Sequence, residues 1–145
     1  MKEDELKKIL RIILSHISNT KVIWRLDGSC NLLVQGIVCT PNDCDIIVSK
    51  KSFLIFTEKL TKFLQKKYYD EKINTDSAIF SIEGIVVEVN HYKDKKLNMF
   101  DKIKPLSWQG LNIPILPLKN AKKFYTLINR PEKVKLINKY LLKNR

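Results

Sequence analysis

Two β-rich segments separated by only two residues constrain the fold of this chain most strongly. Segments 77–82 (SAIFSI) and 85–90 (IVVEVN) are rich in apolar and β-branched residues, and only Glu83 and Gly84 lie between them. A two-residue connection that contains glycine is typical of a tight antiparallel hairpin. The sequence therefore predicts at least one antiparallel strand pair.

The remaining segments predict helices and two further strands around this hairpin. Apolar residues at helical spacing predict helices, and β-branched or aromatic runs predict strands. The predicted helices are 3–18, 29–37, 51–67, 119–129 and 131–144, the further strands are 22–28 and 44–49, and 91–105 is a predicted loop. Pro131 suits the first turn of the last helix, where its missing N–H has no cost. This order predicts an α/β (α+β) protein whose mixed sheet of about four to five strands is covered by helices.

Length and composition predict one globular domain over residues 1–145. A chain of 145 residues can bury one sizeable core, and 44% hydrophobic residues with 4 Gly and 5 Pro exclude disordered and fibrous classes. We place the core of the domain at about 22–90 and its C-terminal helices at about 118–143.

The N-terminal sequence, the apolar runs and the cysteines together indicate where the protein is located. The N-terminus is charged from its second residue, and no apolar run approaches the roughly 18 residues of a membrane span. Cys30, Cys39 and Cys44 are odd in number and lack the C-x-x-C spacing of zinc or redox sites. These features predict a cytoplasmic protein with no membrane partner, in which the cysteines are reduced and pack as small apolar side chains.

The strong positive charge leaves two interpretations open. The chain has 27 Lys and Arg against 15 Asp and Glu, a formal net charge of +12, which favours polyanionic partners such as nucleic acid or nucleotides. However, 23 of the 27 cations are Lys, and they form neither a dense block nor a stripe interleaved with aromatic residues. Lysine can equally be the default surface residue of this protein.

Three carboxylates form the pattern that indicates chemistry. Asp43 and Asp45 are two apart at the start of a strand, so their side chains point to the same face. Like charges so close together are unfavourable unless a cation lies between them, and oxygen ligands suit Mg²⁺. Glu88, inside the apolar strand 85–90, also needs a partner. The alternatives are solvated acids at a loop end for the two aspartates and a cross-strand ion pair for Glu88.

Gly28 and Ser29 supply a second feature, at the end of the first strand. Glycine allows the backbone to approach a phosphate closely, and the following N–H groups can bind phosphate oxygens. The order is strand, Gly-Ser, 13 intervening residues, Asp-x-Asp on a strand, and then an acid on a later strand. In WRLDGS, NDCDIIV and VVEVN this order resembles the nucleotidyltransferase superfamily of DNA polymerase beta, particularly its small stand-alone and toxin-like members.

The resemblance implies roles for seven residues. Asp43, Asp45 and Glu88 would be the catalytic residues and would bind Mg²⁺ or Mn²⁺, with Glu88 also helping to activate the attacking hydroxyl. The nucleotide-binding residues would be Gly28, Ser29, Arg130 and Lys133, the last two as an Arg-x-x-Lys element on a C-terminal helix. Such an enzyme transfers a nucleoside monophosphate from an NTP to an acceptor hydroxyl of RNA, a protein or a small molecule, and a partner protein can supply acceptor recognition.

Several assignments near this pattern have alternatives. Asp27 either caps the short helix that follows or forms an ion pair with Arg25 on the same strand face. His91 lies near enough to Glu88 to reach the site, but we expect it to be structural, and we expect Tyr125 to belong to the core. Besides an enzyme, the sequence is compatible with an inactive nucleotide-binding or protein-interaction module of the same fold, or with a basic nucleic-acid-binding protein.

Overall fold

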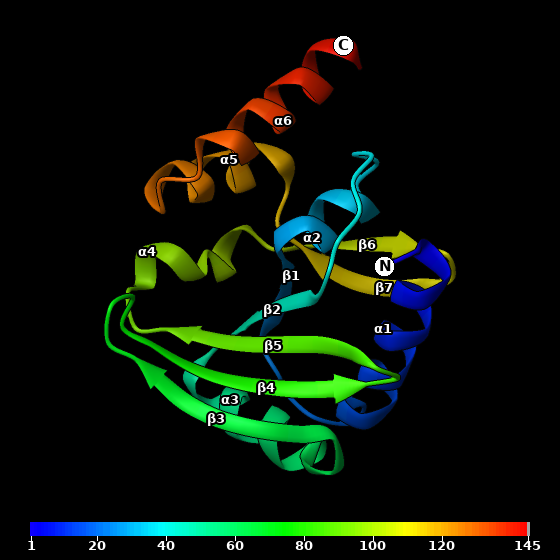
Figure 1. The fold of residues 1–145 in the computed structure, drawn as a ribbon, viewed down its shortest axis with the longest axis vertical. Helices are drawn as coiled ribbons and strands as arrows, with labels where there is room; N and C mark the ends of the chain where they lie inside the picture. Colours follow the sequence, from blue (N-terminus) through cyan, green and yellow to red (C-terminus); the bar gives the residue numbers. More distant parts are fainter. Residues whose placement is uncertain (145) are drawn as a thin grey trace.

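A five-stranded mixed sheet forms the centre of the protein in a computed structural model, which describes residues 1–144 (Figure 1). The strands are β1 (Trp24–Asp27), β2 (Cys44–Val48), β3 (Leu64–Asp70), β4 (Thr75–Ile82) and β5 (Ile85–Tyr92), in the spatial order β1-β2-β5-β4-β3. Only β2 and β5 are parallel, and the other neighbours are antiparallel. This arrangement confirms the predicted mixed sheet of four to five strands.

Helices and a second, two-stranded sheet surround this sheet. The helices are α1 (Glu3–Ile17), α2 (Gly28–Val34), α3 (Lys50–Lys59), α4 (Lys95–Asn98), α5 (Leu118–Leu127) and α6 (Pro131–Lys143), with short 3₁₀ turns at Thr61–Phe63 and Phe100–Lys102. Strands β6 (Lys104–Trp108) and β7 (Leu111–Ile115) pair with each other. Pro131 begins α6, as predicted. In residues 1–144, every helix is too short or too polar to cross a membrane.

The two faces of the central sheet differ in how they are covered. One face packs in a core against α1 and α3, through buried residues such as Leu10, Phe56 and Val89. A second apolar cluster covers part of the other face, where Ile47 of β2 and Tyr92 of β5 contact α5 residues such as Phe124. Strand β3, in contrast, is exposed or only partly buried along its whole length. Helix α5 therefore covers part of the β1 and β2 side of this face, α6 packs against α5, and the β3 side is left open (Figure 1).

Two tight hairpins use residues with positive φ. Glu83 and Gly84 have φ of 53° and 77°, which is the left-handed conformation of a two-residue turn, so the predicted hairpin is confirmed. Gln109 and Gly110, with φ of 47° and 80°, join β6 to β7 in the same way. The prediction missed this second hairpin.

The segments around residues 60 and 100 correct the prediction. The helix predicted over 51–67 ends at Lys59, and residues 64–70 form the edge strand β3 instead. Thr61 contributes to this end because its hydroxyl hydrogen-bonds to the carbonyls of Thr57 and Glu58 in the last turn of α3. The predicted loop 91–105 contains α4 and the start of β6. Pairing with β4 gives residues 64–70 a strand conformation that their local pattern does not specify.

Candidate functional site

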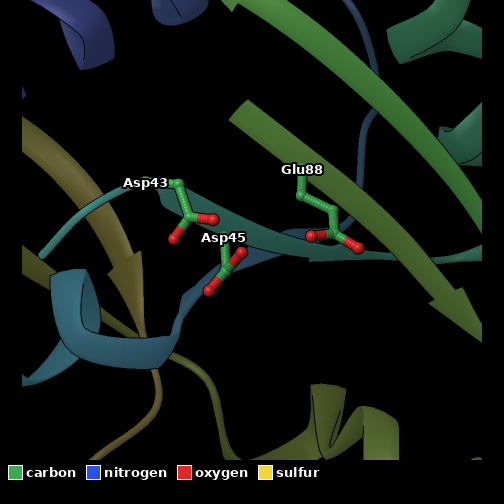
Figure 2. A group of neighbouring side chains, drawn as sticks. All are labelled: Asp43, Asp45 and Glu88. Atoms are coloured by element: carbon green, nitrogen blue, oxygen red, sulfur yellow. The ribbon is translucent and has the colours of Figure 1, made fainter. Parts of the chain in front are cut away.

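The parallel pairing of β2 and β5 brings the three predicted carboxylates together (Figure 2). Asp45 is the direct neighbour of Glu88 in this pairing, and Asp43 lies just before β2, two residues from Asp45. Each of the three offers a carboxylate oxygen, and these oxygens all lie within 4.8 Å of one another. Residues 45 positions apart in the sequence thus form one acidic group on the partly open face of the sheet.

The electrostatics of this group favour a bound cation. Burial, and then the negative charges of Asp43, Asp27 and Glu88, raise the pKa of the Asp45 carboxyl to about 8, and Lys133 opposes this shift. A carboxyl in such surroundings retains its proton at neutral pH unless positive charge enters. Three carboxylates are hard oxygen ligands of the kind that Mg²⁺ and Mn²⁺ prefer. The donor set therefore fits a divalent metal ion.

A cavity of about 400 Å³ opens onto these carboxylates. Its wall includes all four residues predicted to bind the nucleotide, namely Gly28, Ser29, Arg130 and Lys133. A larger cavity, of about 560 Å³, lies beside α4, and Asp101 is its only acidic lining residue. The three carboxylates and the predicted nucleotide-binding residues thus line one cavity, and the larger cavity has no comparable group of carboxylates among its lining residues.

Gly28 permits the close approach between the start of α2 and the carboxylates. Its φ is +63°, a conformation that costs other L-residues roughly 1–2 kcal/mol. A Cβ atom at this position would lie 2.6 Å from Oδ2 of Asp45, which is far inside van der Waals contact. Both the backbone conformation and the space therefore require glycine here.

Ser29 and Lys133 join the first and last parts of the chain at the cavity. The Lys133 ammonium group of α6 donates a hydrogen bond of 2.6 Å to the Ser29 hydroxyl, so a cation is held beside the Gly-Ser turn. Arg130 also lines the cavity, but its guanidinium pairs with Glu132 at 2.5 Å on the exposed side of α6. Of the two predicted basic residues, Lys133 is therefore the one that contacts the turn directly.

Comparisons with known proteins give a clear result only at the level of structure. No protein-family model and no curated protein matches the chain. A Thermotoga maritima protein that is provisionally described as a nucleotidyltransferase has a TM-score of 0.76 at 24% identity, over 99% of this chain and 96% of its own. The chain has the nucleotidyltransferase fold.

Two antibiotic-modifying proteins share this fold. ANT(2″)-Ia, solved in complex with adenylyl-2″-tobramycin, matches with a TM-score of 0.68 at 7% identity over 94% of this chain and 90% of its own. The lincosamide antibiotic adenylyltransferase LnuA, solved with lincomycin bound, has a TM-score of 0.61 at 15% identity over 95% and 97%. The resemblance inferred from the Gly-Ser and Asp-x-Asp pattern is thus confirmed for the fold.

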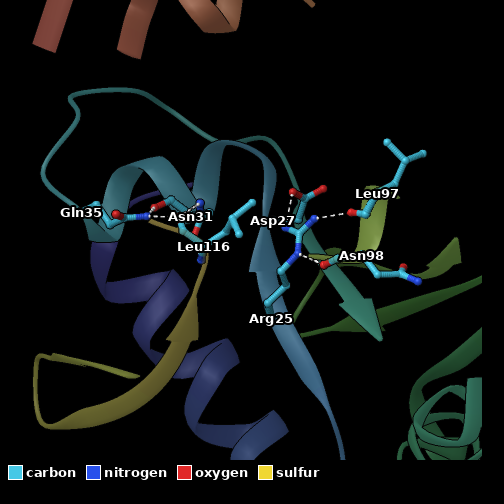
Figure 3. A network of polar contacts seen from close by, with 7 residues as sticks. All are labelled: Arg25, Asp27, Asn31, Gln35, Leu97, Asn98 and Leu116. Atoms are coloured by element: carbon cyan, nitrogen blue, oxygen red, sulfur yellow. Dashed lines mark hydrogen bonds and ion pairs between the residues drawn. The ribbon is translucent and has the colours of Figure 1, made fainter. Parts of the chain in front are cut away.

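Within this nucleotidyltransferase fold, a buried arginine organises the wall beside the carboxylates (Figure 3). Arg25 is 0% exposed and donates to Oδ1 of Asp27 at 2.9 Å, which confirms the predicted ion pair. Its other donors reach the carbonyls of Asn98 and Leu97, and its guanidinium lies 4.9 Å from the centre of the Phe124 ring. The alternative role of Asp27 is wrong, because its side chain makes no capping hydrogen bond to α2.

A second polar network fixes the segment that leads to α5 and α6. The Asn31 side chain of α2 donates to the Leu116 carbonyl at 2.9 Å and accepts from the Leu116 N–H at 3.1 Å, and Gln35 donates to the same carbonyl (Figure 3). Because Leu116 directly follows β7, these bonds set where α5 begins. Sequence reasoning missed this network, since its partners are more than 80 residues apart.

Tyr68 is a further residue that sequence reasoning missed. Its hydroxyl donates to Oε1 of Glu88 at 3.3 Å, from the edge strand β3, which the sequence analysis did not predict. Burial and the charge of Glu88 raise the pKa of Tyr68, so it stays a donor. The Tyr-Tyr pair at 68–69 was the available signal, because aromatic residues favour strands.

The remaining residues near the site have packing roles. A ring nitrogen of His91 lies 3.1 Å from the Val48 carbonyl, on the core side of the sheet, as expected for a structural histidine. Cys30 and Cys44 are fully buried in the core. Hydrogen bonding to Cys30 and burial both raise the pKa of the Cys44 thiol. Tyr125 belongs to the second apolar cluster, as predicted, although it also lines the cavity.

Proposed function

We propose that this protein transfers a nucleoside monophosphate from an NTP to an acceptor hydroxyl in the presence of Mg²⁺ or Mn²⁺. The observation that carries the proposal is the position of Asp43, Asp45 and Glu88 in one cavity with the Ser29–Lys133 contact. Carboxylates for metal ions and a held cation for phosphates are the two requirements of this chemistry.

The three carboxylates would hold the metal. A divalent ion bound there would neutralise the triphosphate and polarise the phosphoryl group that is transferred. The pKa of Asp45 is raised by burial and by its acidic neighbours, so a cation there would favour its ionised form. Ser29 and Lys133 would bind the phosphates farther from the reacting centre, and Arg130 would join them after leaving Glu132.

The bonds, the leaving group and the proton of the proposed transfer can each be accounted for. The acceptor hydroxyl oxygen forms a bond to the α-phosphorus, the bond from that phosphorus to the bridging oxygen breaks, and pyrophosphate leaves. Glu88 would take the hydroxyl proton, since it lies at the open side of the acidic group next to β4. Lys133 would stabilise the negative charge that remains on the leaving pyrophosphate.

The acceptor is RNA, a protein side chain or a small molecule. ANT(2″)-Ia was solved with adenylyl-2″-tobramycin and LnuA with lincomycin, so small molecules are one precedent within the fold. The net charge of +12 favours RNA instead. A partner protein is a further candidate for acceptor recognition, since α6 ends in exposed Leu141 and Leu142.

Label transfer tests the proposal. The protein is incubated with Mg²⁺ and each of the four α-labelled NTPs, with cellular RNA, protein and small-molecule extracts as separate acceptors. We expect label in one acceptor fraction, and loss of that label with Asp45→Asn but not with Asp101→Asn, whose side chain is 77% exposed in the other cavity. Nucleotide binding without transfer to any fraction would instead favour an inactive nucleotide-binding module.

A further inference from the structure

A second polar group lies in the same cavity, outside the three carboxylates. Asp27 lines the cavity with 13% of its side chain exposed, and it is not part of the group whose oxygens converge within 4.8 Å. Only its Oδ1 is used by Arg25. Figure 3 shows the other carboxylate oxygen pointing away from the arginine. Asp27 therefore offers a hydrogen-bond acceptor that has no role in the proposed metal site.

Arg25 fixes this acceptor in place. The guanidinium is fully buried and is held by two backbone carbonyls and by the Phe124 ring, so it has one position. A carboxyl group whose Oδ1 accepts from this guanidinium at 2.9 Å cannot rotate freely. The ion pair also offsets the negative charge that Asp27 would otherwise place beside a triphosphate.

Two tyrosines in the same cavity as Asp27 have hydroxyl groups that can bind a ligand. Tyr92 and Tyr125 line the cavity although they are only 9% and 4% exposed. Burial and then the charge of Asp27 raise the pKa of both phenols, so each hydroxyl keeps its proton and can act as a donor. Over residues 1–144, neither hydroxyl is hydrogen-bonded to another protein group, and neither is a fully buried polar atom without a partner. Their hydroxyls are therefore available to a ligand.

The wall that carries these groups is aromatic and rigid. Phe124 makes edge-to-face contacts with Tyr92 and Tyr125, with ring centres 6.1 and 5.5 Å apart. Aromatic rings with a few fixed polar groups suit a flat, partly polar ring system. The chemistry of the wall thus matches a nucleobase better than a phosphate or a sugar.

The position of Asp27 places this wall on the nucleotide side of the cavity. Strand β1 lies beyond β2 from Glu88, so Asp27 and Glu88 flank Asp45 on opposite sides. Asp27 directly precedes the Gly-Ser turn, and Tyr125 lies on the helix that leads to Arg130 and Lys133. A ligand with its phosphates at Lys133 can reach Asp27 with its nucleoside part.

We propose that Asp27, Tyr92 and Tyr125 form a base-recognition subsite that selects an NTP whose base carries an exocyclic amino group. The amino group donates to the free oxygen of Asp27, and the base lies against the aromatic wall. A carbonyl oxygen in the same place, as in uracil or hypoxanthine, meets another hydrogen-bond acceptor instead of a donor and is rejected. This inference rests on the proposed nucleotide binding and adds its specificity.

Binding measurements with matched bases test the subsite without any acceptor. Dissociation constants for Mg²⁺ complexes of ATP, CTP, GTP, UTP and ITP are measured by calorimetry. We expect the NTP that binds most tightly to carry an exocyclic amino group. Its counterpart with a carbonyl oxygen or hydrogen at that position (UTP for CTP, ITP for ATP or GTP) should have a dissociation constant about tenfold higher. Asp27→Asn, which retains an oxygen for Arg25, should reduce this ratio of dissociation constants to about twofold or less, while Asp101→Asn should leave the ratio unchanged.

Tyr125→Phe gives an independent reading that leaves the Arg25–Asp27 pair intact. We expect it to lower the same ratio several-fold, with unaltered thermal unfolding in the absence of nucleotide. Tightest binding of UTP or ITP would overturn the subsite, as would a ratio that neither variant changes. Equal binding of all five nucleotides overturns the subsite alone, whereas no binding of any nucleotide overturns the proposed function as well.

Discussion

Replacing the central carboxylate should stabilise the protein when no metal is present. In Asp45→Asn an amide takes the place of a carboxyl whose pKa is raised from 3.8 to about 8 by burial and by Asp43, Asp27 and Glu88. Each pKa unit corresponds to 1.36 kcal/mol, so ionisation of this group in the folded, metal-free protein costs on the order of 5 kcal/mol. Some contact with water through the cavity lowers this cost, and we expect a gain of about 2–5 kcal/mol at pH 8.

The pH dependence gives the sign of this effect. Between about pH 4 and pH 8, Asp45 is protonated in the folded chain and ionised in the unfolded chain, so the folded state binds more protons. The free energy of unfolding of the metal-free wild type should therefore fall as the pH rises through this window. Asp45→Asn lacks this contribution, so the two proteins should be about equally stable near pH 4 and diverge toward pH 8.

Urea denaturation with EDTA at several pH values measures this difference. Asp101→Asn is the matched control because it removes an exposed aspartate outside the cavity. Mg²⁺ should then stabilise the wild type, more strongly as the pH approaches 8, and have little effect on Asp45→Asn. If Asp45→Asn shows the same pH slope as the wild type, or is the less stable protein at pH 8 with EDTA, the acidic group is not under the strain that we infer.

Three further changes test other parts of the site. Gly28→Ala should destabilise the protein by about 1–3 kcal/mol in urea denaturation and weaken Mg²⁺ binding, because its φ is +63° and its Cβ would displace Asp45. Tyr68→Phe removes an exposed hydrogen bond to Glu88, so it should weaken Mg²⁺ binding several-fold in calorimetry and change the free energy of unfolding by less than about 0.5 kcal/mol. An unchanged Mg²⁺ affinity would show that Tyr68 does not position Glu88. If the acceptor is RNA, Lys133→Ala should weaken RNA binding and reduce its dependence on salt in titrations at several salt concentrations, whereas negligible wild-type binding would leave a small-molecule or protein acceptor.

The carboxylate group was predictable because it depends on strand geometry. Asp43 and Asp45 lie two apart, and alternation along a strand is enough to place them on one face. Glu88 joins them because its strand pairs with β2 and because its neighbours Val87 and Val89 face the core. The side chain of Glu88 must then point to the opposite face of the sheet, where the two aspartates lie. The sequence thus contained both the residues and the rule that brings them together.

Edge strands and long-range polar contacts were not predictable in this way. Strand β3 has no buried face, so its sequence lacks the alternation that distinguishes a strand, and the apolar spacing through Leu64 suggested a helix. Strand β7 contains Pro114, which normally argues against a strand but is tolerated in a two-stranded hairpin, where it lies opposite Pro105. The role of Arg25 depends on carbonyls 72 and 73 residues away, which no local pattern indicates.

The uneven cover of the central sheet explains how one cavity can combine selectivity with access. On the β1 side, α5 and α6 enclose the wall of Asp27, Tyr125 and Lys133, where buried aromatic rings and fixed charges leave few orientations for a ligand. On the β3 side the same face is open, and within residues 1–144 Tyr68 is the one residue that donates a hydrogen bond to the Glu88 side chain. If the protein transfers nucleotides as we propose, the enclosed half would favour one nucleotide, because a wrong base leaves buried groups unpaired. The open half would impose little shape on the acceptor, so the surface next to β3, of this chain or of a partner protein, would determine which acceptor binds.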